Sequence, residues 1–225
     1  TDCQSLVSLT LCGAARLRLL PIRSGSLVTL NLMQCEALED DAIAAACAGC
    51  SALQALHVNE CGRLEQPSFQ SPVLRRLHVG ECDGLSAATF SPSHWATPSL
   101  TCLSITHCRQ PDLNLDQAGW PVSLRDVTLD RCTALSDQAL RRLSQLCARL
   151  ERLVVRSCPR VRAPELDAPC LTELDFGSCD QLCTQAVAAV LKRCPRLARL
   201  ELAGCDMVHT AELTETARAQ LSQIS

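Results

Sequence analysis

The chain has 225 residues, of which 47% are apolar and only 2% aromatic, and its formal net charge is −3. A charge this close to zero, spread without basic clusters, argues against a protein that binds nucleic acid or a membrane surface. No apolar run is long enough to span a bilayer. With so few aromatic residues, the core must be built from aliphatic side chains and thiols.

A nine-residue phrase, L-x-x-L-x-L-x-x-C, recurs along the whole chain. Its nine copies begin at Leu6, Leu27, Leu53, Leu74, Leu100, Leu124, Leu150, Leu171 and Leu197. Recurrence of this phrase is the signature of leucine-rich repeats, in which each repeat adds one strand to a parallel sheet. We therefore expect an α/β leucine-rich-repeat solenoid. It would be a right-handed coil with a parallel concave sheet of about nine strands, and helices alternating with extended segments on the convex side. Residues 1–225 form a single array in this prediction.

The intervals between the closing cysteines alternate between short and long. Counted from Ala14, which takes the first cysteine position, they are 21, 26, 21, 26, 24, 26, 21 and 26 residues. In the long repeats the apolar residues after the cysteine follow a helical period, which predicts helices over 40–49, 137–147 and 184–193. Asp40, Asp137 and Thr184 precede these apolar stripes, and we expect their side chains to cap the helices.

The short repeats follow another template, in which prolines recur at fixed places. Pro67 and Pro72 in one short repeat match Pro164 and Pro169 in another. Proline lacks an N–H group and disfavours helical geometry in the residue before it. We therefore expect extended chain, without a helix, over 65–71 and 162–168.

The middle of the array is irregular. Residues 83–99 contain Pro92, Trp95 and Pro98, which leave at most a broken turn of helix. Trp95 and Trp120 could anchor a binding partner or fill an irregular convex layer, and we favour the second interpretation.

The two ends of the array differ. No polar cap precedes the first phrase, so we expect residues 1–225 to be the C-terminal part of a longer chain, with the first-repeat edge covered by missing chain or by a partner. At the other end, Thr210 repeats the helix-cap position, and an amphipathic helix is predicted to close the stack. The apolar stripe of that helix comprises Leu213, Ala217, Leu221 and Ile224.

The chain contains seventeen cysteines, most of which the repeat explains. Eight close a phrase, where a thiol behaves as a small buried apolar group. They are Cys35, Cys61, Cys82, Cys108, Cys132, Cys158, Cys179 and Cys205. Disulfide frameworks are typical of short secreted domains, so we expect reduced thiols and a reducing, cytoplasmic location, with a ciliary location as the alternative. Cys47 and Cys50 form a single C-x-x-C, which we interpret as packing because zinc would need a second pair of ligands.

The third, fifth and seventh residues of each phrase point outward and are predicted to line the concave face. Histidines occupy the middle of this face, and charges of alternating sign occupy the last four repeats. The candidate protein-binding residues are His57, His78, Asp126, Arg152, Arg156, Glu173, Asp175, Arg199 and Glu201. The charged members form either a docking patch or merely exposed cross-strand pairs.

A catalytic or metal-binding role is the alternative interpretation of the histidines. His57, His78 and His107 lie in successive repeats, but no carboxylate or thiol stands at ligand spacing from them. The sequence also contains no phosphate-binding loop, nucleophile elbow or pair of catalytic acids. We therefore expect a protein that is not an enzyme and that binds no metal or cofactor.

Two segments carry a family resemblance. Cys132–Leu140 and Cys179–Val187 combine C-x-x-L with a helix start of the form D/T-x-A-Φ, where Φ is apolar. This combination resembles the leucine-rich-repeat half of F-box proteins, and the resemblance extends over essentially the whole chain. It implies a substrate-recognition adaptor, in which the repeats hold a protein substrate and a separate F-box segment recruits a ubiquitin ligase. The alternative is a structural subunit of a large stable assembly, such as a ciliary axoneme or an organellar complex. Either way we expect a protein partner, whose identity the sequence does not give, rather than nucleic acid.

Overall fold

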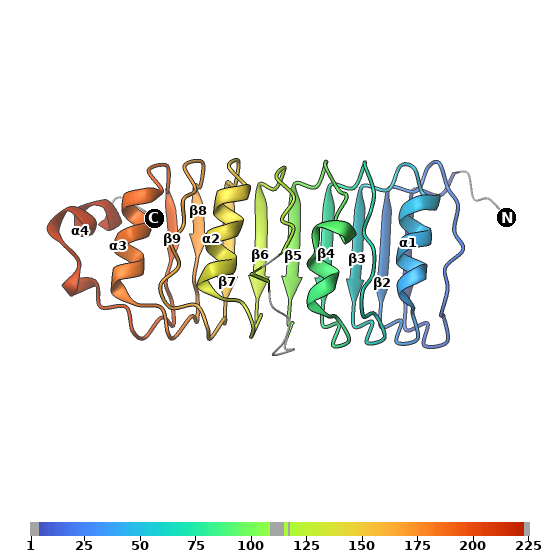
Figure 1. Cartoon of the computed structure of the whole chain (residues 1–225), viewed down its shortest axis with the longest axis horizontal. Coiled ribbons are helices and arrows are strands. Elements are labelled where there is room, and N and C mark those ends of the chain that lie inside the picture. The colour runs from blue at the N-terminus through green and yellow to red at the C-terminus, as the bar shows by residue number, and fades with distance from the viewer. Residues whose placement is uncertain (1–4, 109–114, 117, 223–225) are drawn as a thin grey trace.

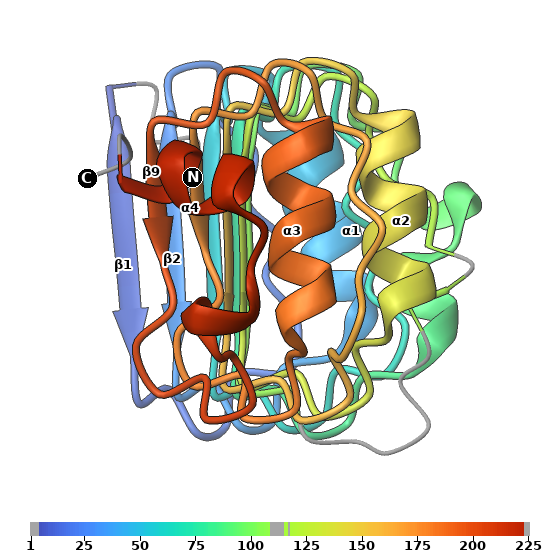
Figure 2. The same cartoon turned by 90° about the vertical axis from the view of Figure 1, so that its left-hand side faces the viewer.

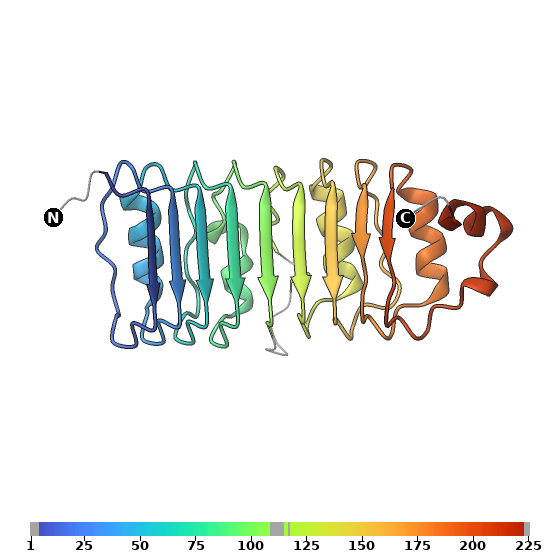
Figure 3. The same ribbon diagram turned by 180° about the vertical axis from the view of Figure 1, so that it is seen from behind.

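The computed structural model describes residues 5–108, 115–116 and 118–222. Within them, nine strands form one parallel sheet whose spatial order is the sequence order. The strands are β1 (Ser8–Cys12), β2 (Thr29–Met33), β3 (Ala55–Asn59), β4 (Arg76–Gly80), β5 (Cys102–Thr106), β6 (Asp126–Asp130), β7 (Arg152–Arg156), β8 (Glu173–Asp175) and β9 (Arg199–Glu201). Each phrase supplies one strand, as predicted. The helices all lie on one side of the sheet, which faces the viewer in Figure 1. The opposite side of the sheet faces the viewer in Figure 3.

The coil has the predicted right-handed sense. In Figure 1 the helices face the viewer, the strands run downward and the chain advances to the left. This is the handedness that connections between parallel strands almost always adopt. The fold is therefore the α/β leucine-rich-repeat solenoid expected from the phrase.

The leucines of the phrase fill the core. In the second layer Leu27, Leu30 and Leu32 are completely buried, and the corresponding residues of the later layers are nearly all buried as well. Leu200 and Leu202 of the last layer are only partly buried against the core, and so are Leu9 and Leu11 of the first layer. Among the described residues, no layer lies beyond β1 to cover them.

Helices occur where the long intervals predict them. They are α1 (Asp40–Gly49), α2 (Asp137–Leu146) and α3 (Thr184–Arg193). The proline-containing segments 65–71 and 162–168 contain no helix, as expected. None of the helices in the described part of the chain is long and apolar enough to cross a membrane.

The predicted helix caps are wrong. Asp40, Asp137 and Thr184 are the first helical residues, and the cap positions before α1, α2 and α3 are taken by Glu39, Ser136 and Cys183. Of these, Ser136 does accept a hydrogen bond from the N–H of Ala139, at 3.2 Å.

The side chains predicted as caps instead bind the backbone of the next repeat. The carboxylate of Asp40 accepts hydrogen bonds from the N–H groups of Glu65 and Gln66, at 3.0 and 2.9 Å. Asp137 accepts from Arg162 and Ala163 in the same way, at 2.9 and 3.0 Å. The hydroxyl of Thr184 accepts from the N–H of His209 at 2.9 Å. Each of these side chains therefore braces a long repeat against the segment that follows it.

The C-terminal helix also begins later than predicted. A 3₁₀ turn over Thr210–Glu212 precedes α4 (Glu215–Ser222), so the helix begins after Thr214 and not at Thr210. Thr214 accepts a hydrogen bond from the N–H of Ala217 at 3.3 Å and takes the capping role. Leu213 and Ala217 are buried as expected, Ile224 lies outside the described residues, and α4 packs against α3.

The irregular middle contains only two short 3₁₀ turns, over Ala87–Phe90 and Pro92–His94. The indole N–H of Trp95 donates to the carbonyl of Thr89 at 2.6 Å, and the ring packs on Phe69 and Phe90. Trp95 and Trp120 are both buried, which supports their interpretation as fillers of the convex layer.

One turn geometry recurs after every strand. The residue before each closing position has a positive φ between 51° and 73°, although only Gly13 and Gly204 are glycines. In the other seven layers the residue is Gln34, Glu60, Glu81, His107, Arg131, Ser157 or Ser178. The N–H of this residue donates to a carbonyl of the following layer, as from Glu60 to Gly80 at 2.9 Å. The turn thus links consecutive layers at the edge where the strands end.

The closing cysteines link each layer to the one before it. The thiol of Cys158 donates to the carbonyl of Leu129 at 3.6 Å, and the thiol of Cys179 donates to that of Val155 at 3.3 Å. The sixteen cysteines among the described residues are all free, and those that close a phrase are buried. The packing role predicted for these thiols is confirmed.

A core truncation tests the layer packing. Leu153 is completely buried in the layer of β7, so Leu153→Ala should lower the free energy of unfolding by about 2–5 kcal/mol through lost burial and a residual cavity. Thr128→Ala, on the outer side of the sheet, is the matched control and should change it by less than about 0.5 kcal/mol. Urea denaturation measures both values, and equal effects of the two substitutions would contradict the assigned core.

Thiol labelling tests the state of the cysteines. Cys35, Cys61, Cys132, Cys158 and Cys179 are buried whereas Cys12 is exposed, and burial raises the pKa of Cys179 to about 12. A maleimide added to the native protein at pH 7 should label Cys12 and leave those five unmodified until denaturant is added. Peptide mass spectrometry gives the sites, and a disulfide among the five would refute both the packing and the expected reducing location.

Candidate protein-binding face

The candidate residues lie on the side of the sheet opposite the helices, which we call the open face. Figure 2 views the stack from its C-terminal end and shows the strands on the left and α1, α2 and α3 on the right, so that the left-hand side of the sheet is the open face. The strand register places one residue of each phrase in a continuous middle column. The column consists of Thr10, Asn31, His57, His78, Ser104, Thr128, Val154, Asp175 and Glu201. This is the column expected from the sequence.

The two histidines of the column are neighbours on β3 and β4. Their ring centroids lie 6.0 Å apart with the planes tilted by 37°. Burial lowers the pKa of both, and the nearby Arg76 lowers that of His57 further. These effects favour the neutral form of both rings.

His107 does not join this pair. It occupies the turn after β5, where its ring lies 2.6 Å from Arg131 and 3.9 Å from the carboxylate of Glu81. In the described part of the chain, no group of three or more His, Cys, Asp or Glu side chains is arranged to hold a metal ion.

The charged residues of β6–β9 form a continuous ladder along one flank of the open face. Arg152 contacts Asp126 on one side at 3.2 Å and Glu173 on the other at 3.3 Å. Arg199 then contacts the second oxygen of Glu173 at 2.9 Å. The ladder follows from the parallel register, which sets the four side chains beside one another in this order.

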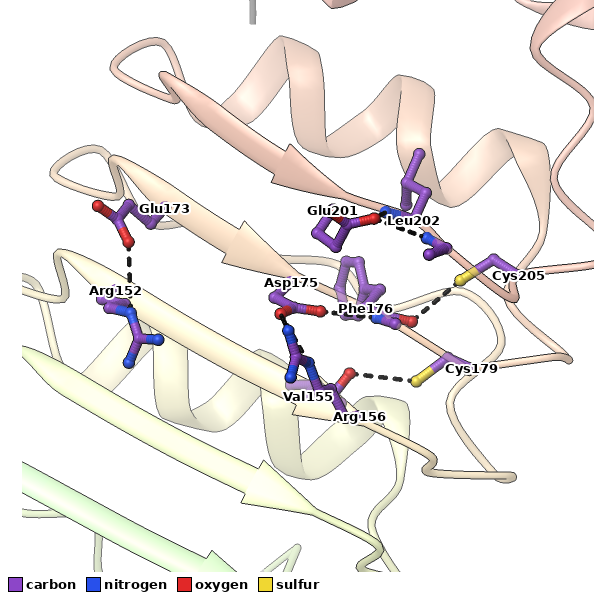
Figure 4. A network of polar contacts seen from close by, with 12 residues as sticks. Arg152, Val155, Arg156, Glu173, Asp175, Phe176, Cys179, Glu201, Leu202 and Cys205 are labelled. Carbon is purple, nitrogen blue, oxygen red and sulfur yellow. Dashed lines mark hydrogen bonds and ion pairs between the residues drawn. The ribbon is translucent and has the colours of Figure 1, made fainter. Parts of the chain in front are cut away.

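A second ion pair lies next to the ladder. The Nε of Arg156 donates to Oδ2 of Asp175 at 2.7 Å, and this contact raises the pKa of Arg156. The other oxygen of Asp175 accepts from the N–H of Gly177 at 2.8 Å. Glu201 turns back onto its own chain, where Oε1 accepts from Leu202 and Ala203 at 3.1 and 3.0 Å. Figure 4 shows these contacts together with the thiols beneath them.

A shallow cleft opens between these side chains. It has a volume of about 210 Å³ and is lined by residues of β7, β8 and β9, with the nearly buried Val154 among them. Six candidate residues line it: Arg152, Arg156, Glu173, Asp175, Arg199 and Glu201. Asp126 adjoins the cleft through Arg152, whereas His57 and His78 lie away from it on β3 and β4. The candidates therefore divide into one charged site and one separate histidine pair.

The sequence reasoning missed a second cleft. Glu36, Glu60, Glu81, Asp83 and His107 line a space of about 490 Å³ at the edge where the strands end. Three of these residues occupy the turn positions with positive φ. Carboxylates in the eighth place of successive phrases, at Glu60 and Glu81, were the available signal. The alternation of a strand predicts only the third, fifth and seventh places of the phrase on the concave face.

Known proteins support the fold. No family model matches the chain, and no curated protein matches it either. A chain in the crystal structure of the Rad7–Elc1 complex in yeast is similar with a TM-score of 0.62 at 19% identity, over 96% of this chain and 54% of that one. A chain in the crystal structure of the TLR13–ssRNA13 complex is similar with a TM-score of 0.60 at 20% identity, over 80% of this chain and 25% of that one.

These similarities show the fold, a leucine-rich-repeat solenoid, and leave the activity open. The chain spans about half the length of the first neighbour and a quarter of the second.

The ladder makes a prediction about folding energetics. Glu173 and Arg199 are both more than one-third exposed, so a double-mutant cycle of Glu173→Gln and Arg199→Gln should give a coupling energy of only about 0.2–1 kcal/mol. Urea denaturation at low and at high salt measures it, and the coupling should fall as salt screens the pair. A coupling above about 2 kcal/mol that does not respond to salt would show that the ladder is needed for folding.

Proposed function

We propose that this chain is a non-enzymatic protein-interaction module that docks its partner on the open face of β6–β9. The observation that carries this proposal is the exposed ladder of alternating charges from Asp126 to Arg199, which lies beside a cleft. The parallel sheet below holds the ladder in a fixed register. Charged groups set out in this way favour one partner and one orientation, because a wrong partner would bring like charges together.

A protein suits this surface better than nucleic acid. Each arginine of the ladder is next to a carboxylate, and the face offers few positive groups in all, whereas nucleic-acid affinity comes from neutralising many successive phosphates. A protein surface can present both signs of charge.

The finer role that we propose is that of a substrate-recognition adaptor of a ubiquitin ligase. Its support is the resemblance of Cys132–Leu140 and Cys179–Val187 to the repeats of F-box proteins. The similarity to a chain of the Rad7–Elc1 complex is consistent with work inside a multi-subunit complex. The free, buried thiols support a reducing, cytoplasmic location, and a ciliary location is its alternative.

A structural subunit of a large stable assembly is the second candidate. It is favoured by the first layer, where Leu9 and Leu11 are only partly buried and Val7 is 56% exposed. Such an edge suits a permanent neighbour, whether missing chain or another protein. A single stoichiometric partner that survives high salt would decide for the structural subunit, and an F-box upstream of Thr1 would decide for the adaptor.

Inverting the ladder tests the docking surface. The combined variant Asp126→Arg, Arg152→Glu, Glu173→Arg and Arg199→Glu keeps every neighbouring pair of opposite sign but exchanges the charges shown to a partner. We expect a native circular dichroism spectrum and a loss of partner capture of about tenfold or more, since charge complementarity is replaced by repulsion. Quantitative mass spectrometry of affinity-purified wild-type and variant protein measures the loss.

The control is a charge inversion of one ion pair on the convex side, where the helices lie. Arg141 and Glu165 form an ion pair there at 2.9 Å, so Arg141→Glu combined with Glu165→Arg should leave partner capture unchanged. If the ladder inversion folds and captures the same partners as the wild type, the open face of β6–β9 is not the docking surface.

A further inference from the structure

We propose that the open face of β7–β9 is built to receive an acidic peptide segment, with carboxylates of the partner binding the guanidinium groups of Arg152 and Arg199. This inference rests on the proposed function and adds the chemistry of the partner. The six charged groups that line the cleft are three arginines and three carboxylates, so their formal charge alone favours neither sign. The exposed fractions of the side chains and the use of their hydrogen-bonding atoms do.

The arginines are more exposed than Glu173 and Asp175. The side chains of Arg152, Arg156 and Arg199 are 46%, 55% and 64% exposed. Those of Glu173 and Asp175 are 37% and 15% exposed. A molecule that approaches the open face over β7 and β8 therefore meets more of the guanidinium groups than of these two carboxylates.

Two of the three acids, Glu173 and Asp175, have already used both carboxylate oxygens as acceptors. In Glu173, Oε1 is bound by Arg199 and Oε2 by Arg152. In Asp175, Oδ1 is bound by the N–H of Gly177 and Oδ2 by Arg156. These carboxylates therefore have little capacity left for a cationic ligand.

The arginines have N–H donors that the ladder does not use. A guanidinium has five N–H groups, and Arg199 contacts Glu173 through Nη1. Arg152 uses Nη1 for Asp126 and Nε for Glu173, which leaves its Nη2 edge to solvent or a ligand. A partner carboxylate can therefore bind without displacing the ladder, and the charge-assisted bonds would be of the stronger kind.

The two arginines are close enough for one short segment to reach both. Arg152 and Arg199 lie in the same column two strands apart, and both guanidinium groups reach the carboxylate of Glu173 between them, at 3.3 and 2.9 Å. Their donors are therefore closer together than the roughly 10 Å between the two strands. In a polyproline II segment, residues i and i+3 are on the same side and about 9 Å apart, so two glutamate side chains of such a segment can converge on the two arginines.

A peptide titration tests the proposal. The probe is a fluorescein-labelled peptide that repeats Glu-Pro-Pro-Glu, and the same sequence with Arg in place of Glu is the counter-probe. Fluorescence anisotropy with the full chain should show binding of the acidic peptide, weaker binding of the basic one, and loss of the signal as salt is raised.

Two substitutions give opposite expected signs. Arg199→Gln should weaken binding of the acidic peptide by about two- to fivefold, as expected for one exposed charged contact. Glu173→Gln removes the internal competitor of both arginines and should strengthen binding by a similar factor. The matched control is Arg141→Gln on α2, where the side chain is 48% exposed, and it should leave binding unchanged.

The outcomes separate this inference from the proposed function. Tighter binding of the basic peptide, or weaker binding of the acidic peptide by Glu173→Gln, overturns the acidic partner but leaves the open face as a docking surface. If neither peptide binds while the ladder inversion still abolishes partner capture, the acidic segment is again wrong and the proposed function stands. If capture also survives the inversion, both are wrong.

Discussion

Every part of this molecule depends on one constraint, the spacing of about 4.8 Å between neighbouring strands of a sheet. Each turn of the coil therefore has to bring the chain back to the start of the next strand while the chain advances by only this distance along the stack. The chain meets the requirement with a left-handed residue after every strand, which in eight of the nine layers is followed directly by a buried cysteine. The N–H of the first reaches the layer ahead, and the thiol of the second reaches the layer behind. Cysteine suits this place because it is small, apolar and still able to donate a weak hydrogen bond.

The same constraint creates the charged surface. Parallel strands in constant register bring equivalent residues of successive phrases side by side, so charges separated by more than twenty residues become direct neighbours. Arg152 thereby gains a carboxylate from the layer on each side. The arginines do not have to be ordered when a partner arrives, which reduces the entropy lost on binding.

The sequence predicts the strands, the three long helices and the open-face columns because these depend on periods that can be counted along the chain. It does not predict where Asp40 and Asp137 form their hydrogen bonds, because their acceptor role involves backbone about 25 residues away. The sequence does not predict the left-handed turns, because seven of the nine turns have a residue other than glycine at the left-handed position. The C-terminal helix starts later than predicted because the hydroxyl of Thr214 accepts the N–H of Ala217 and caps the helix there. Similarly, the charges of Glu173 and Asp175 can be read from the sequence, whereas the occupation of their oxygens needs coordinates.

The braces at Asp40 and Asp137 bear on how such an array can change in length during evolution. Each carboxylate sits at the start of a helix and needs two backbone N–H groups of an extended segment in the next layer. Deleting one short repeat would bring two helical repeats together, and the carboxylate would then face the start of a helix in place of the extended segment that it now binds. Deleting a long and a short repeat together, about 47 residues, would leave the braces intact. Duplication and loss should therefore be tolerated in steps of two layers, and the heritable module of this chain is the pair.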